Sequence, residues 1–145
     1  MRKIWIRFGI GLLVVFLALQ LIPVQPPLGK NANEIKTEER VKKIFRKSCY
    51  DCHSDLVQWP WYSKVFPVSL YISHHIEEGR EELNFSEWET LKPEKKADLA
   101  EEILEEIEEG NMPPKDYIFL HPNSKLDPEE IEVLRDWLQT FAENQ

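Results

Sequence analysis

Two cysteines separated by two residues, with a histidine directly after the second, constrain this chain more than any other feature. They form the stretch Cys49-Tyr50-Asp51-Cys52-His53. At this spacing two thiols can add across the two vinyl groups of one haem, and the adjacent imidazole then lies within reach of the iron. The stretch therefore predicts haem c attached covalently at Cys49 and Cys52, with His53 as the proximal iron ligand.

Cysteine pairs at this spacing also occur in thiol-disulfide oxidoreductases and in zinc sites. A thioredoxin-like pair normally opens a helix after a strand, and no strand-helix-strand pattern surrounds Cys49 and Cys52. A zinc site would need a second pair of Cys or His ligands at matching spacing, which the sequence lacks. We therefore favour haem and keep a thiol-disulfide oxidoreductase using these two cysteines as an alternative.

The amino terminus has the composition of a membrane segment. Three basic residues lie among the first seven, and the following run, residues 8–22, is apolar apart from Gln20. As a helix, residues 4–22 would match a hydrocarbon core of roughly 30 Å. We expect residues 1–23 to be an uncleaved single-pass anchor, because a small-x-small cleavage pattern is missing; a cleaved signal peptide is the alternative. The basic residues at the start of the chain predict that this end lies in the cytoplasm.

The rest of the chain predicts a small all-α domain over residues 35–145, joined to the anchor by a proline-rich linker at residues 24–34. Apolar residues recur at helical spacing over residues 38–48, 67–83 and 93–109 and after Asp127, and no strand pattern occurs. Residues 111–126 are interpreted as a polar loop. Residues 31–145 carry 14 basic and 26 acidic residues, so no nucleic-acid partner is expected.

An unusual density of aromatic residues and prolines follows the histidine of the motif. Trp59, Trp61 and Tyr62 are predicted to wall the haem. Pro60 or Pro67 is expected to present a backbone carbonyl to Nδ1 of the proximal histidine, the kind of bond that orients a ligating imidazole.

The order of these parts resembles a class I, mitochondrial-type cytochrome c. Phe45 lies one turn before the first cysteine, Met112 stands beside a proline in a late loop, and the last helix carries Trp137. The resemblance implies that Phe45 and Trp137 meet where the first and last helices of the domain cross. It also implies that His53 and Met112 ligate opposite faces of the iron.

A closer resemblance, over roughly residues 35–143, is to the small membrane-anchored haem-binding domain proteins of bacteria. It rests on Cys49-Tyr-Asp-Cys-His-Ser54, Trp59-Pro-Trp-Tyr-Ser63, Glu78-Gly-Arg80, Leu83-Asn-Phe-Ser86, Met112-Pro-Pro114 and Leu120-His-Pro122. This resemblance implies haem attachment on the outer side of the bacterial inner membrane. The haem domain is therefore expected to face the periplasm.

The sixth iron ligand has several candidates. Met112 lies beside Pro113 and Pro114, and a neutral thioether suits iron of high potential. His74, His75 and His121 are rivals. Neighbouring helical residues point about 100° apart, so at most one of His74 and His75 can face the haem.

With four haem nitrogens and two protein ligands the iron has no vacant position for a substrate, so the sequence predicts a one-electron carrier and no catalytic residues. The alternative is a haem domain that binds or senses oxygen, nitric oxide or peroxide. A respiratory protein is the expected redox partner. The basic residues Lys42, Lys43, Arg46 and Lys47 are expected to give the haem side a positive field that steers an acidic partner.

Overall fold

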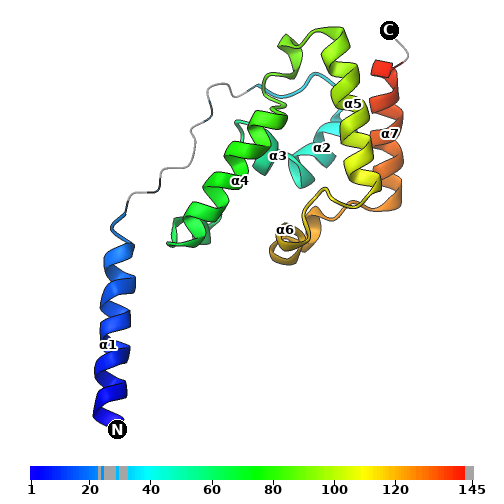
Figure 1. Cartoon of the computed structure of the whole chain (residues 1–145). Helices are drawn as coiled ribbons and strands as arrows, with labels where there is room; N and C mark the ends of the chain where they lie inside the picture. Colours follow the sequence, from blue (N-terminus) through cyan, green and yellow to red (C-terminus); the bar gives the residue numbers. More distant parts are fainter. Residues whose placement is uncertain (23, 25–28, 30–32, 143–145) are drawn as a thin grey trace.

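The computed structural model describes residues 1–22, 24, 29 and 33–142, and the regular structure in these ranges is all helical, without a strand (Figure 1). The prediction of an all-α fold is confirmed. The α-helices are α1 (Arg2–Leu19), α2 (Glu39–Ser48), α3 (Tyr50–His53), α4 (Val68–Glu82), α5 (Pro93–Glu108), α6 (Lys115–Leu120) and α7 (Pro128–Ala142). Three short 3-10 helices are η1 (Trp61–Lys64), η2 (Trp88–Thr90) and η3 (Pro122–Ser124).

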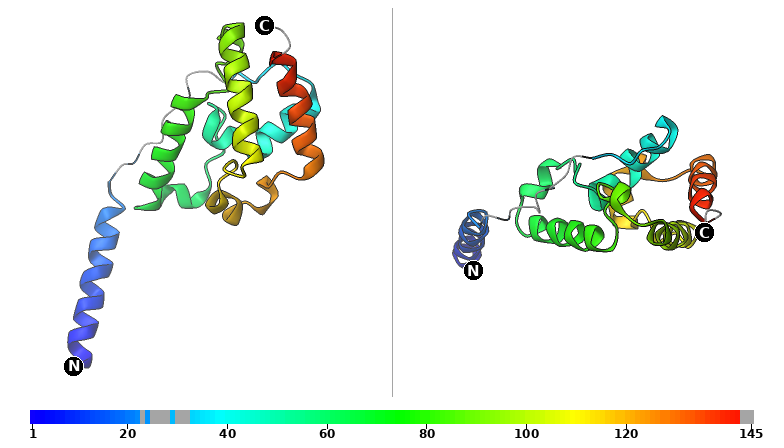
Figure 2. Two further views of the ribbon diagram at one scale, coloured as in Figure 1. Left: turned by 45° about the vertical axis from the view of Figure 1, so that its right-hand side comes forward. Right: turned by 90° about the horizontal axis from the view of Figure 1, so that it is seen from above.

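Helix α1 stands apart from the other helices (Figure 2), and none of its residues is buried. It ends at Leu19, before the predicted end at residue 22. Its first seven residues include three basic side chains, which shortens its uncharged part further. The uncharged remainder from Phe8 to Leu19 would extend only roughly 18 Å. In the part of the chain that the structure describes, no helix is both long and apolar enough to cross a membrane. The expected transmembrane helix is thus not supported.

The end of α1 contacts the helical domain through one side chain. The amide of Gln20 donates to the backbone oxygen of Phe66 at 3.2 Å and accepts from its N–H at 2.9 Å. Much of the predicted linker, residues 25–28 and 30–32, lies outside the described residues.

The hydrophobic core lies where α2, α5 and α7 pack together, and Figure 1 shows α5 and α7 side by side. The apolar stripe of each helix supplies it, with Val41, Phe45, Leu99, Ala100, Leu134 and Leu138 buried. The rings of Phe45 and Trp137 meet edge to face, with centroids 5.3 Å apart. This contact, which the cytochrome resemblance implied, is confirmed.

The boundaries of the last two long helices follow their capping residues. Gly110, directly after α5, has a φ of 74°, a backbone conformation that suits glycine at a helix end. Asp127 accepts a hydrogen bond from the N–H of Glu130 at 2.8 Å, and the carboxylate of Glu130 accepts one from the N–H of Asp127 at 3.0 Å. These two bonds form the predicted capping box of α7.

The segment predicted to be a polar loop, residues 111–126, contains α6 and η3 instead. Helix α6 has only six residues, which is under two turns and too short to produce a helical apolar period in the sequence. None of its residues is buried. Its position therefore has to come from side-chain contacts rather than from packing into the core.

Candidate functional site

The predicted haem-attachment residues lie together on one short helical turn. The N–H groups of Cys52 and His53 donate to the carbonyl of Cys49 at 3.2 and 2.9 Å. Residues three and four apart on a helix share a face, so both cysteines and the histidine face the same side. All three line one cavity of about 510 Å³.

The cavity lies among α3, α4, α5 and the segment that follows α5, and Figure 1 shows α3 between α4 and α5. Most of its lining is apolar, and the apolar side chains are Leu83, Phe85, Leu99, Ile103, Ile107 and Leu126. A largely apolar cavity with a few polar groups at fixed positions is the usual form of a cofactor site.

The imidazole of His53 is oriented by the end of α4. Its Nδ1 lies 2.7 Å from the carbonyl oxygen of Gly79 and 3.1 Å from that of Leu83, so Nδ1 carries the proton and donates it. Nε2 is then the lone-pair nitrogen available to a metal. Burial lowers the pKa of His53, which favours the neutral form that a ligand needs.

The carbonyl acceptors for this histidine were predicted wrongly. Pro60 and Pro67 do not accept from Nδ1; residues at the end of α4 do. The carbonyl oxygen of Gly79 also accepts the N–H of Leu83 at 3.0 Å, so it uses its second lone pair for the imidazole, and the proline pattern did not indicate this.

Sequence reasoning also missed the packing role of Gly79. A Cβ placed on this residue would lie 3.0 Å from the backbone oxygen of Cys52 and 3.5 Å from its Cβ. The absence of a side chain thus lets α4 approach the cysteine turn. A glycine inside a helix costs about 1 kcal/mol relative to alanine, so its presence there was the available signal of a close approach.

Met112 lies at the same cavity, although it is distant in the sequence from the cysteine motif. It lines the cavity together with Pro113 and Pro114, and its side chain is 38% exposed. The N–H groups of Asn111 and Met112 both donate to the carbonyl of Glu106, at 3.0 and 3.1 Å. The C-terminal turn of α5 therefore delivers Met112 to the cavity mouth.

Of the three rival histidines, only His75 lines the cavity. His74 is exposed and lies 3.2 Å from the carboxylate of Glu78. His121 lies outside the lining, with Nε2 at 2.9 Å from the hydroxyl of Tyr62. The structure thus leaves Met112 and His75 as the residues near enough to compete for a sixth position.

Comparison with known proteins agrees with this site. A family model described as a haem-binding domain matches residues 14–140, which is most of the chain. This chain belongs to the haem-binding domain family. No curated protein and no solved structure matches it.

Within this haem-binding domain, both cysteines are half-buried. Burial raises the pKa of Cys49 to about 12 and that of Cys52 to about 11. Reactive thiols have the opposite shift, because the thiolate is the nucleophile. A zinc site gains no support either, since the described residues contain no group of three or more His, Cys, Asp or Glu side chains placed to hold a metal ion.

The predicted aromatic haem wall does not line the cavity. Trp59, Trp61 and Tyr62 are absent from its lining, and Trp61 is 79% exposed. Trp61 and Tyr62 belong to η1, which packs against α4. Phe85 and Tyr117 supply the aromatic rings of the lining, and the ring centroids of Phe85 and His53 lie 6.5 Å apart.

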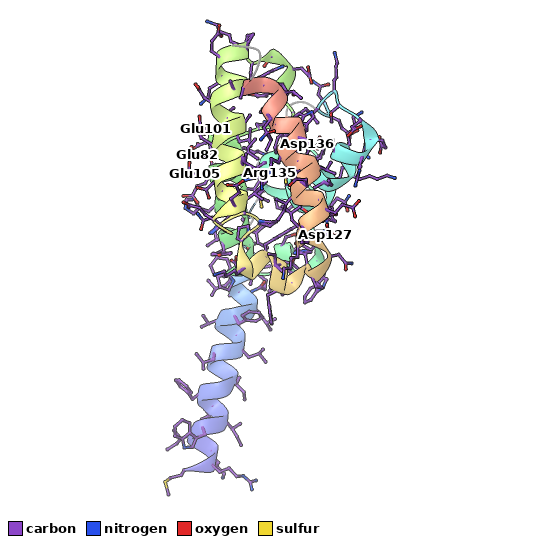
Figure 3. The ribbon with its side chains drawn as sticks, turned by 90° about the vertical axis from the view of Figure 1, so that its right-hand side faces the viewer. Glu82, Glu101, Glu105, Asp127, Arg135 and Asp136 are labelled. Atoms are coloured by element: carbon purple, nitrogen blue, oxygen red, sulfur yellow. The ribbon has the colours of Figure 1, made fainter. Side chains whose placement is uncertain are left out.

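The charge around the haem cavity is acidic, contrary to the expected positive haem side. Carboxylates from α4 and α5 line it, namely Glu78, Glu82, Glu102 and Glu106 (Figure 3 shows Glu82 with Glu101 and Glu105 of α5). None of the four predicted basic residues does. Arg46 donates to Glu39 at 2.7 Å and Lys47 to Glu130 at 2.6 Å, so two of those charges are paired within the domain.

Proposed function

We propose that this haem-binding domain holds one haem c, attached through Cys49 and Cys52, and acts as a one-electron carrier. The observation that carries the proposal is one cavity lined by both cysteines, by His53 and by Met112. Two thiols, one imidazole and one thioether form a donor set that fits covalent attachment of haem c with two axial ligands from the protein.

In this proposal each residue has a separate task. His53 offers Nε2 to the iron while Gly79 and Leu83 hold its Nδ1 proton. Met112 offers its sulfur from the cavity mouth, and the apolar lining excludes water. The haem, when bound, supplies the reversible one-electron couple of its iron. A thioether and a neutral imidazole raise the potential of that couple, because neither adds negative charge.

The proposed location is the outer face of the bacterial inner membrane, in the periplasm, with a respiratory redox protein as partner. Covalent attachment on that side is what the family resemblance implies. The exposed apolar side chains of α1, which include Trp5 and Phe8, support association of this helix with a membrane.

A second function has one observation in its favour. Met112 is partly exposed at the mouth of the cavity, so its sulfur could be displaced by a small ligand such as carbon monoxide or nitric oxide. The protein would then be a ligand-binding haem domain, with the same attachment residues.

The test uses the full chain produced together with haem-attachment machinery. Haem staining after denaturing electrophoresis should show haem that stays on the chain, and loss of the stain would overturn covalent attachment. A ferrous protein that does not bind carbon monoxide, combined with reversible one-electron oxidation, supports a carrier. Rapid carbon monoxide binding by the wild-type protein would favour the second function.

A further inference from the structure

Helix α6 directly follows the Met112-Pro113-Pro114 segment, so the position of α6 in the fold determines the position of the segment's C-terminal end. It contributes no buried residue, and Phe119 and Leu120 are 83% and 56% exposed. Tyr117 and Ile118 are half-buried, so side-chain hydrogen bonds add to a limited packing of α6 on the domain.

The first of these bonds joins α6 to the cysteine turn. The hydroxyl of Tyr117 donates to Oδ2 of Asp51 at 2.8 Å. Asp51 lies between the two cysteines, and its Oδ1 accepts from the N–H of Gln58 at 3.0 Å, which fixes the carboxylate. Both Tyr117 and Asp51 line the haem cavity.

The second bond joins α6 to α4. The hydroxyl of Tyr71 donates to Oδ2 of Asp116 at 2.5 Å, and Asp116 also accepts from the N–H of Tyr117 at 3.0 Å. Hydrogen bonds with one charged partner are the stronger kind. Two adjacent residues of α6 are thus fastened to two different walls of the cavity.

From this geometry we propose that Tyr71 and Tyr117 are positioning residues: together with Asp116 and Asp51 they clamp α6, and through it they hold Met112 over the haem. Upstream, the segment is anchored by the two N–H bonds to the carbonyl of Glu106. The inference rests on the proposed ligation of the iron by Met112. Downstream, Pro113 is buried, and the two tyrosine bonds hold the end of the segment through α6. Losing these bonds should therefore make the sixth iron position easier to open.

The experiment compares Tyr71→Phe, Tyr117→Phe and the double variant with wild type, all as the full haem-loaded chain. The probe is exogenous imidazole, which must displace the Met112 sulfur to bind ferric iron. Each lost hydrogen bond should tighten apparent imidazole binding about fivefold, and the double variant more than either single one. The absorption band of the ferric iron-thioether bond should disappear at correspondingly lower imidazole concentrations.

Thr90→Val is the control, because it removes a side-chain hydroxyl bond, to the carbonyl of Glu87 at 2.7 Å, that does not involve α6. It should leave imidazole affinity near the wild-type value. Asp51→Ala removes the acceptor for both Tyr117 and the N–H of Gln58, so it should tighten imidazole binding at least as much as Tyr117→Phe does.

A readout independent of the iron is amide hydrogen exchange over residues 111–120. It should quicken in the double variant and remain unchanged in Thr90→Val. Unchanged imidazole affinity and exchange in the double variant, with the thioether band present in wild type, would overturn the clamp alone. A wild-type protein without the thioether band would overturn Met112 ligation, and the clamp as a device for holding that ligand with it.

Discussion

The two sides of the haem cavity are built differently. On the His53 side, backbone atoms make the contacts: α4 supplies two carbonyl groups to Nδ1, and Gly79 lies against the backbone of Cys52. On the Met112 side, a partly exposed residue is followed by a helix without buried residues that side chains hold in place. The comparison teaches that the position of His53 is fixed by backbone contacts of the fold, whereas the position of Met112 depends in part on side-chain contacts that can be broken separately.

The largest effect is expected from removing the attachment residues on the fixed side. Cys49→Ala combined with Cys52→Ala removes both thiols, so haem staining of the denatured chain should fall to background. Ser48→Ala, a neighbouring change that keeps both cysteines, should leave the stain unchanged. Haem that stays on the double-alanine chain after denaturation would contradict attachment at these residues.

On the distal side, Met112→Ala should leave the haem attached and open the sixth position. The ferrous variant should bind carbon monoxide to near saturation, and its potential should fall because the thioether is lost. His75→Ala is the informative control, since His75 is the one rival histidine that lines the cavity. If His75→Ala, and not Met112→Ala, opened the site, the ligands would be two histidines.

The close approach of α4 to the cysteine turn can be broken with a single methyl group. Gly79→Ala would place a Cβ 3.0 Å from the oxygen of Cys52, and the backbone cannot move aside without displacing the turn. We expect a loss of about 1–3 kcal/mol in the free energy of unfolding, measured by urea denaturation. The same change at Gly11, inside α1, meets nothing within 4 Å and should not destabilise the protein. Equal effects at the two positions would count against the packing role of Gly79.

The difference between the two sides also explains what could be predicted from the sequence. Cys49, Cys52 and His53 are close in the chain, so their spacing alone placed them on one face of a turn. Met112 is distant from them, and only its proline neighbours and the family resemblance drew attention to it. The long amphipathic helices were found because their apolar period is repeated several times, and the capping box at Asp127 located the last one.

The predictions that the structure does not support share a physical cause. They concerned tertiary contacts, and the residues that make these contacts have no periodic pattern in the sequence. A haem wall was expected from the aromatic residues Trp59, Trp61 and Tyr62. Trp61 and Tyr62 instead belong to η1, which packs against α4. The basic residues of α2 were expected to face a partner, yet carboxylates distant in the sequence, such as Glu130, neutralise part of them. Pairing of this kind depends on the fold and cannot be predicted from local charge.

The smallest effect is expected from the four carboxylates of α4 and α5 that line the cavity. Because Glu78, Glu82, Glu102 and Glu106 line it, a cationic small redox reagent should exchange electrons with the haem faster than an anionic one at low ionic strength. Replacing Glu82 and Glu102 by Gln should reduce this ratio of rates by about two- to threefold, and salt near 0.1 M should reduce it further, since the screening length is then about 10 Å. Stopped-flow measurement of both reagents gives the ratio directly.

Lys42→Gln combined with Lys43→Gln is the control, because these residues lie outside the cavity lining and should change the ratio less. A wild-type protein that reacted faster with the anionic reagent would restore the positive haem side expected from the sequence, and a respiratory partner would then be acidic rather than basic.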